Sequence, residues 1–534
     1  MDRSLSRGVA WLAALVVSGG LFYLSSSPVL AGLGLLIYVG LAWLRLDLAL
    51  ASVIVFVPYF MHPKHVVLGR HAEFAPSELL LVAVALIAGV IILLDLLRVG
   101  PPARRGRLPA GSGKDRRSDF PWPAVWPEWN ILRGSPFLLP TLLFTAAALI
   151  STAFAVEQTV ALRELRETII EPVIYFALLL LFIGGLPPEP RRRALLILGI
   201  AVVVAGTLVS LLGLAQYVSG SKDLVTIPGS SYRRIRAWYG SPDNLGLLLD
   251  RSIPLCLALL LAPVLLVRRL SRQNDLQSSN RALGSPWAVG LALCLLFMMA
   301  ALALTFSLGA WIAIGLTVAI FVVMLGFVAR DRLRRQRGIV AVAGVAVTGL
   351  LALALYAGFS GHLAGAFAHV HGVTAQRRID VWRSSVRMIR DHPLVGVGPD
   401  NFLHYYAPKH QRFIRCAHGL GYMQPAAHDE PCLSQPHDEL LDFWLSTGIL
   451  GLLAFAALQM VFWRIIYQQR NHLPQAPVML GAALAMLAAL IHGLIDESYF
   501  LPDLSMLTWL LFAIAALSAP NGRRLNHPLG PPGG

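Results

Sequence analysis

Long apolar stretches separated by short polar segments recur along the whole chain of 534 residues. Most stretches approach the roughly 20 apolar residues that a helix needs to cross a bilayer. They predict spans near residues 9–24, 28–44, 46–60, 78–97, 136–154, 172–186, 194–217, 245–267, 287–306, 308–329, 338–359, 443–466, 476–496 and 504–519. The pattern therefore predicts an all-α, polytopic integral membrane helical bundle of about 12–14 transmembrane helices with one large periplasmic or extracellular loop.

The composition agrees with this reading and excludes two other classes of protein. Hydrophobic residues make up 56% of the chain and charged residues only 14%. A soluble globular chain carries about 25% charged residues, so a water-soluble enzyme is excluded. Intrinsic disorder is excluded too, because it requires low hydrophobicity and high net charge.

The chain has a net charge of +15. In a membrane protein, the distribution of the basic residues predicts the orientation of the spans, and the charge does not indicate nucleic acid as a partner. Lys and Arg collect in cytoplasmic loops, and a cytoplasmic N-terminus puts most basic segments inside. The expected parts of the chain are N-terminal transmembrane helices at 1–98, a basic cytoplasmic linker at 99–135, central transmembrane helices at 136–359, a large outer loop at 360–442, C-terminal transmembrane helices at 443–519, and a disordered cytoplasmic tail at 520–534.

Three groups of arginine fall on the outer side despite this rule. They are Arg163 with Arg166, the segment 233–236, and the segment 377–390. A cluster of positive charge on this face favours an anionic substrate. Contact with anionic lipid headgroups is the alternative, and Arg163 and Arg166 could instead form surface ion pairs with Glu164 and Glu167.

The large outer loop opens with an amphipathic helix at residues 376–390. Its apolar face carries Val381, Trp382, Ser385, Met388 and Ile389, and another face carries Arg383, Arg387 and Arg390. Such a helix is typical of a segment lying along the membrane surface. Trp382 is a neighbour of Arg378 at i,i+4 and could stack on a sugar, although aromatic residues are also common at membrane interfaces.

Histidine and carboxylate side chains lie where the chain re-enters the membrane. His437 can titrate near neutral pH and act as a general base, with Asp438 or Glu439 orienting its ring. The alternative is an ordinary polar helix start. His492 and Asp496 are spaced i,i+4 near the outer end of a span, where ionisable residues usually face the interior and serve either a substrate or internal hydrogen bonds.

Two cysteines, Cys416 and Cys432, share the outer loop. The outer side is oxidising, so a disulfide between them is favoured. Zinc ligation together with His418 and His428 is a weaker alternative because the spacing is not a standard zinc pattern, and free thiols are a third.

Several motifs together resemble the O-antigen ligase and O-antigen polymerase superfamily. The most specific part is the sequence Arg-x-x-x-Trp at 378–382, then Asp-His-Pro-Leu-Val-Gly-Val-Gly-Pro-Asp-Asn-Phe at 391–402, then His-Asp-Glu-Leu-Leu at 437–441. The resemblance runs from about 140 to 515. Its further segments are Ala161–Arg166 with Glu171-Pro172, Arg236–Asn244 and His492–Asp496. The family's Thr-x-Ser-Arg-Gly reads Thr305-Phe-Ser-Leu-Gly309 here, so any role of that arginine is lost or moved to another arginine.

The resemblance implies an inverting glycosyltransferase at the outer face of the cytoplasmic (inner) membrane. Its donor would be a polyprenyl-diphosphate-linked glycan and its acceptor a hydroxyl of a glycan, lipid or protein, with membrane lipid around it. The implied catalytic residues are His437, Arg378 and Arg236. The implied substrate-binding residues are Arg163, Arg166, Arg233, Asn244, Trp382, Asp438, Glu439, His492 and Asp496. No cofactor and no metal are expected, because no Asp-x-Asp motif is evident in the outer loops.

Two other functions fit parts of the pattern. A transporter or flippase for an anionic or lipid-linked solute would also use arginines and intramembrane His/Asp pairs, although such proteins commonly show internal repeats and none is evident here. A non-catalytic partner in glycan assembly is the third reading, and Leu308 in place of arginine keeps it open.

Overall fold

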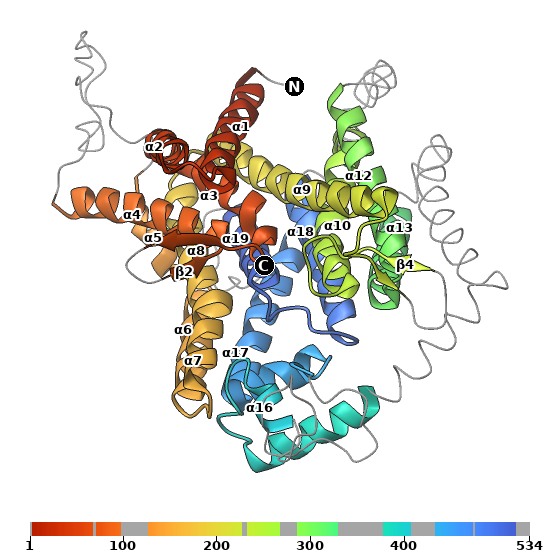
Figure 1. Cartoon of the computed structure of the whole chain (residues 1–534). Coiled ribbons are helices and arrows are strands. Elements are labelled where there is room, and N and C mark those ends of the chain that lie inside the picture. Colours follow the sequence, from red (N-terminus) through yellow and green to blue (C-terminus); the bar gives the residue numbers. More distant parts are fainter. Residues whose placement is uncertain are drawn as a thin grey trace, which may run out of the picture. The chain divides into compact units, whose positions relative to one another are not determined.

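A computed structural model of the chain describes residues 3–67, 71–97, 126–226, 232–267, 286–328, 378–406, 433–473 and 476–519. These residues are helical apart from turns and two short antiparallel hairpins (Figure 1). One hairpin pairs β1 (Lys64–Val67) with β2 (His71–Phe74), and the other pairs β3 (Val225–Thr226) with β4 (Arg233–Arg234). The predicted all-α membrane fold is therefore confirmed.

Among the described residues, six helices are long and apolar enough to cross a membrane. They are α1 (Arg3–Leu24), α4 (Pro76–Leu96), α9 (Pro188–Ser219), α10 (Pro242–Val267), α12 (Pro286–Thr305) and α17 (Glu439–Gln468). The shorter apolar helices are α2 (Pro28–Leu44), α3 (Leu46–Phe56), α6 (Leu138–Ala153), α13 (Leu308–Val328), α18 (Pro477–Gly493) and α19 (Pro502–Ser518). Each of these helices overlaps a span predicted from hydropathy.

The remaining elements are short and connect or extend the spans. They are the 3-10 turn η1 (Val57–Tyr59), α5 (Trp129–Arg133), α7 (Gln158–Glu164), the π-helical η3 (Leu165–Ile170), α8 (Glu171–Leu178), the π-helical η4 (Leu179–Ile183) and α16 (Phe402–Tyr406). The predicted span at 338–359 and the tail at 520–534 lie outside the described residues, as does most of the linker at 99–135.

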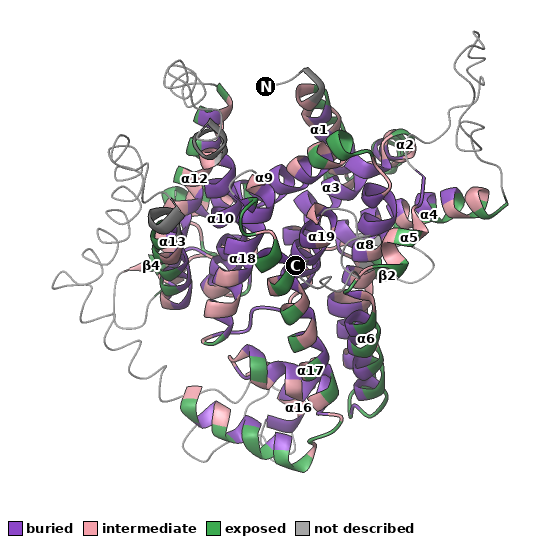
Figure 2. Cartoon of the chain, turned by 180° about the vertical axis from the view of Figure 1, so that it is seen from behind, coloured by how far each residue is buried: buried purple, intermediate pink, exposed green. Residues whose placement is uncertain are grey.

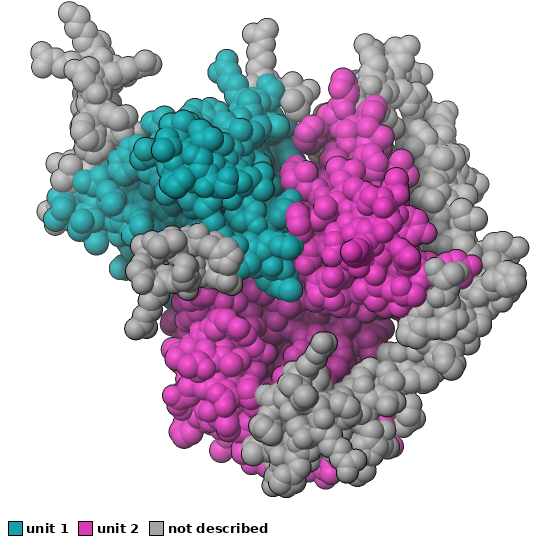
Figure 3. Space-filling model, viewed as in Figure 1, with its two compact units in different colours: residues 1–138, 173–201, 512–534 teal, residues 139–172, 202–511 magenta. Residues whose placement is uncertain are grey.

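The chain divides into two compact units (Figure 3). Unit 1 comprises residues 1–138, 173–201 and 512–534, and unit 2 comprises residues 139–172 and 202–511. Within unit 1, α3 is buried along its whole length, as expected for a helix that is apolar on every face. All the predicted site residues that the structure describes belong to unit 2.

Unit 2 is built around α10, which packs against α12, α13 and most extensively against α18. Both α10 and α18 are buried over most of their length, whereas α6 exposes one side (Figure 2). An aromatic cluster adds to this core. Phe443 stacks on Phe455 at 3.9 Å between ring centroids, and Trp509 donates a hydrogen bond to Tyr499 Oη over 2.8 Å. Tyr499 in turn donates to Thr168 O over 3.0 Å, which fixes the turn between α18 and α19.

Candidate active site

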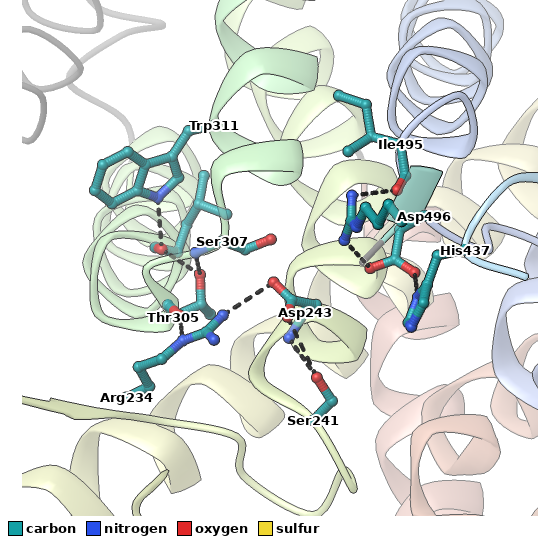
Figure 4. Close-up of polar contacts among 11 residues, drawn as sticks. Arg234, Ser241, Asp243, Thr305, Ser307, Trp311, His437, Ile495 and Asp496 are labelled. Atoms are coloured by element: carbon teal, nitrogen blue, oxygen red, sulfur yellow. Dashed lines mark hydrogen bonds and ion pairs between the residues drawn. The ribbon is translucent and has the colours of Figure 1, made fainter. Parts of the chain in front are cut away.

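His437 and Asp496 form a hydrogen-bonded pair near the start of α17 (Figure 4). His437 lies two residues before α17, and Asp496 lies in the turn that follows α18. His437 Nδ1 is 2.7 Å from Asp496 Oδ1. The side chain of His437 is 26% exposed and that of Asp496 only 6%, so the carboxylate is buried and the ring is accessible.

This arrangement gives the ring of His437 a defined chemistry. An ionised carboxylate at Nδ1 holds the proton on that nitrogen and leaves the lone pair on Nε2. Burial by itself lowers the pKa of His437, but the charge and hydrogen bond of Asp496 outweigh it and raise that pKa above its ordinary value. Burial raises the pKa of Asp496, yet the opposing effects of His437 and Arg378 hold it well below its usual range. Asp496 is therefore ionised at neutral pH.

Arg378 completes this group from the helix at residues 378–391, which is called the outer-loop helix after its predicted position. Its Nη2 lies 3.5 Å from Asp496 Oδ2, and its Nη1 donates to the carbonyl oxygen of Ile495. Two buried N–H donors on this helix, Arg378 Nε and Trp382 Nε1, have no acceptor among the described residues. Because buried donors are nearly always paired, these two N–H groups are candidates to bind acceptor oxygens of a ligand.

The outer-loop helix has the two faces that its sequence predicts. Val381, Met388 and Ile389 are buried in a small apolar cluster, whereas Arg383 and Arg387 are exposed. The helix is thereby held with Arg378 turned toward Asp496.

The turn after this helix docks directly on α17. Gly396 and Gly448 both have positive φ, 72° and 70°, and a Cβ on either would collide with the backbone of the opposite segment.

Hydrogen bonds also join this turn to α17. Val397 N donates to Leu445 O over 2.7 Å, and the hydroxyl of Ser151 on α6 is within hydrogen-bond distance of the carbonyl oxygens of both Val395 and Ser446. Trp444 Nε1 also donates to Pro393 O over 2.8 Å. The glycines of the outer-loop motif therefore permit a backbone contact that positions His437.

A second polar group lies at the turn between α12 and α13 (Figure 4). Arg234 Nε donates to Thr305 O over 2.6 Å, and its Nη2 donates to Asp243 Oδ1 over 2.9 Å. Asp243 lies in the first turn of α10, and its charge acts on His437. The hydroxyl of Ser307 is buried without a hydrogen-bond partner among the described residues.

A third group of charges is buried within the spans. His492 Nδ1 is 2.5 Å from Asp250 Oδ2, which joins α18 to α10. Arg251 donates to the carbonyl oxygen of Ser498 and, over 3.0 Å, to its hydroxyl. Glu439 is buried at the start of α17 and is also hydrogen-bonded to Ser498. Together these contacts hold the turn that carries Asp496.

The other predicted arginines lie away from the His437–Asp496 pair. Arg163 forms an ion pair of 2.9 Å with Asp400. Arg166 pairs with Glu167 at 2.6 Å and with Glu171 at 3.7 Å, in line with the ion-pair alternative. Arg236 donates to Asp223 O over 2.8 Å and lies 3.7 Å from its carboxylate, and Arg233 is exposed on β4. Asn244 is half-buried in the first turn of α10.

The carboxylate that orients His437 differs from the two that the local sequence suggests. Asp438 caps α17 by accepting from Leu441 N over 2.9 Å, and Glu439 points into the buried group, so Asp496 takes the orienting position. His492 is buried against Asp250, as expected of an ionisable residue facing the interior. Cys416 and Cys432 lie outside the described residues.

Backbone strain is concentrated in the same segments. The non-glycine residues with positive φ in the described ranges are Ala237, Phe306, Asp400 and His437, with values of 50° to 54°. Ala237, Asp400 and His437 fall within motifs on which the family resemblance rests, and Phe306 falls within the segment 305–309 that departs from the family's motif. Strained residues of this kind cluster at functional sites, where the surrounding structure holds them.

Three site residues were not singled out from the sequence: Arg234, Asp250 and Arg251. The sequence does contain a signal for Asp250 and Arg251. They are an adjacent acid and arginine within a predicted span, and such residues usually face the protein interior and have a function. Arg234 is one of three nearby arginines, and nothing in the spacing separates it from the others. In the described ranges no three His, Cys, Asp or Glu side chains are grouped so as to hold a metal ion.

Part of the chain matches a known protein family. Residues 293–456 match the sequence profile of a family described as O-antigen ligase. The matched stretch begins within α12 and ends within α17, and it contains Arg378 and His437. A search of curated proteins gives no match to the chain.

Proposed function

Because this chain carries an O-antigen ligase domain at residues 293–456, we propose that it transfers glycan from a polyprenyl-diphosphate donor to a hydroxyl acceptor. Membership of this family supports a membrane glycan-processing role with glycosyltransferase-like activity. The donor, the acceptor and the mechanism described below belong to the proposal. The reaction takes place at the outer face of the cytoplasmic membrane, where the orientation derived from basic loops puts the outer-loop helix.

The observation that carries the proposal is the contact between His437 Nδ1 and Asp496 Oδ1. A histidine held by an ionised carboxylate accepts a proton at its other nitrogen, and the carboxylate stabilises the imidazolium that forms. His437 is the accessible member of the pair and Asp496 the buried one. An exposed ring held by a buried carboxylate suits a base that contacts a substrate hydroxyl.

In the proposed step, the acceptor oxygen attacks the anomeric carbon of the donor sugar while His437 Nε2 takes the hydroxyl proton. The bond from the anomeric carbon to the diphosphate oxygen breaks, and its electron pair stays on the diphosphate. A single displacement of this kind inverts the anomeric configuration. The residues His437 and Asp496 need no metal for the proton transfer, so the proposed mechanism is metal-independent.

Arg378 is proposed to stabilise the departing diphosphate. Arginine binds phosphate oxygens with a planar fork of N–H donors, and such donors matter most where negative charge develops. Its Nε and the nearby Trp382 Nε1 are buried donors that lack an acceptor in the described part of the chain. A phosphate oxygen would accept from Arg378 Nε, and a sugar or phosphate oxygen would accept from Trp382 Nε1.

The proposal is tested in cells that lack the gene and are complemented with wild type, His437→Ala or His472→Ala. His472 is an exposed histidine outside the site and serves as the matched control. The amounts of lipid-linked glycan exposed on the outer leaflet and of mature surface glycan are measured at equal protein level.

We expect His437→Ala to accumulate exposed donor and to lose mature glycan like the deletion, whereas His472→Ala behaves as wild type. Product lengths then separate polymerisation from ligation. Donor trapped on the inner leaflet would instead show a transporter or flippase. Normal glycan with His437→Ala would show a non-catalytic role, and both results would overturn the proposal.

A further inference from the structure

Arg234 occupies a position that the alternation of β4 singles out. In the β3–β4 hairpin, Arg233 pairs with Thr226 and Arg234 with Val225, so the two arginines point to opposite faces. Arg233 is exposed, whereas the side chain of Arg234 is only 18% exposed. The hairpin therefore turns one arginine inward.

Arg234, the inward arginine, is hydrogen-bonded to the turn between α12 and α13. Its Nε donates to Thr305 O over 2.6 Å, and the next residue, Ile235, donates its backbone N–H to Leu304 O over 3.0 Å. Asp243 Oδ1 accepts from Arg234 Nη2 over 2.9 Å and so fixes the plane of the guanidinium. These two side-chain bonds use two of the five N–H donors that arginine carries.

The same turn presents the N-terminus of α13, a helix of 21 residues. Ser307 precedes the helix, and its carbonyl oxygen accepts from Trp311 N over 3.1 Å. The first N–H groups of a helix have no partner within it and attract negative charge. Ser307 is 1% exposed, yet its hydroxyl has no partner among the described residues (Figure 4). The buried hydroxyl of Ser307, which has no partner among the described residues, is a second and independent indication of a binding site at this N-terminus.

The first residue of α13 is Leu308, which cannot contribute a positive charge. The motif that this turn resembles has an arginine at that position. Arg234 brings a guanidinium to the turn from another part of the chain. Its partner Asp243 also acts electrostatically on His437. A guanidinium therefore lies at this turn although position 308 carries leucine.

We propose that Arg234, Ser307 and the N-terminus of α13 form an anion subsite for one phosphate of the lipid diphosphate, with Arg234 replacing an arginine at position 308. The subsite rests on the proposed function for its ligand. Arg378 then faces the leaving oxygen beside His437, and Arg234 holds the diphosphate from the α12–α13 turn. Arg236, whose guanidinium is engaged with Asp223, has no part in it.

The test uses the purified full-length protein in detergent and two probes, farnesyl diphosphate and farnesyl monophosphate. The variants are Arg234→Ala, Arg234→Lys and the double variant Arg234→Ala/Leu308→Arg. Arg387→Ala removes an exposed arginine of the outer-loop helix and is the control. Thermal unfolding is recorded for each variant to identify loss of folding.

We expect Arg234→Ala to weaken diphosphate binding by about tenfold or more and monophosphate binding by less, because one phosphate contact is lost. Arg234→Lys recovers part of the affinity, since it keeps the charge without the fork. The double variant recovers most of it, whereas Arg387→Ala binds as wild type. A purely structural role for Arg234 would not be rescued by arginine at position 308.

The subsite is overturned if Arg234→Ala binds farnesyl diphosphate as wild type does, or if it loses affinity and the double variant, folded to the wild-type unfolding temperature, recovers none. These results are distinct from failure of the transfer reaction. If His437→Ala leaves cellular glycan unchanged while Arg234→Ala still weakens diphosphate binding, glycan transfer fails and the anion subsite stands.

Discussion

His437 Nδ1 lies 2.7 Å from Asp496 Oδ1 although the two residues are 59 positions apart in the chain. The contact joins the residue that precedes α17 to the turn that follows α18. Arg378 approaches the other carboxylate oxygen at 3.5 Å, so Asp496 is held between a ring and a guanidinium. Asp496 therefore joins His437, the proposed base, to Arg378, the proposed phosphate ligand.

Replacing Asp496 by Asn is expected to lower the transfer rate by roughly 10²- to 10⁴-fold. The amide keeps the shape of the side chain but no longer holds the proton on Nδ1 or stabilises the imidazolium. The measurement is the turnover rate of purified protein with a lipid-linked donor. The control is Glu189→Gln, which neutralises an exposed carboxylate outside the site. Equal rates for the Asp496→Asn variant and wild type would contradict the assignment.

The transfer rate is expected to rise with pH through the raised pKa of His437. A general base works only when it is deprotonated, so the active fraction grows as the pH passes that pKa, which lies above the ordinary value for histidine. In Asp496→Asn the main influence that raises the pKa of His437 is lost, while burial and the charge of Arg378 still lower it. The rising limb therefore moves to lower pH in this variant. If the rising limb of the pH–rate profile lies at the same pH in wild type and Asp496→Asn, a group other than His437 titrates.

Replacing Arg378 by Ala is expected to reduce kcat by about 10²-fold, the usual effect of removing one donor at a developing negative charge. Arg378→Lys should recover only part of this loss, because an ammonium lacks the planar fork. Steady-state kinetics over a range of donor concentrations separates the effect on kcat from the effect on KM. A change confined to KM would show that Arg378 binds the donor equally in the ground state and in the transition state.

Gly309→Ala is expected to destabilise the protein by about 1–3 kcal/mol. A Cβ at this position would collide with the ring of His492, which is held by Asp250 and has nowhere to move. Thermal unfolding in detergent measures the effect. Gly290→Ala is the matched control, because a Cβ there meets no atom within 4 Å, and its unfolding temperature should equal or exceed that of wild type. An unchanged unfolding temperature for Gly309→Ala would contradict the packing.

The spans could be predicted from the sequence because the long apolar runs in the described ranges overlap helices of the structure, although the run at 172–186 is divided between α8 and η4. The run at 338–359 lies outside the described residues. The faces of the outer-loop helix were predictable for the same reason, since Val381 and Met388 alternate with Arg383 and Arg387 at helical spacing. The disulfide between Cys416 and Cys432 stays a prediction. Mass spectrometry of unreduced peptides would test it.

The composition of the site was less predictable. The choice of Asp496 over Asp438 depends on how the turn after α18 packs against α17, and no local spacing encodes that packing. The choice of Arg234 over Arg236 depends on the pairing of two short strands. Both are contacts between segments distant in sequence, for which hydropathy and motif spacing carry no information.

The buried pair of His492 and Asp250 also constrains how this chain is made. These residues are 242 positions apart, and Arg251 adjoins Asp250 on α10. A charged residue at the centre of a membrane helix costs roughly 2.5–3.5 kcal/mol on insertion scales. At translation rates of roughly 5–20 residues per second, α10 leaves the ribosome on the order of 10–50 s before its partner α18. During that interval Asp250 and Arg251 lack their partners His492 and Ser498, so we expect the insertion machinery to retain α10 until α18 arrives.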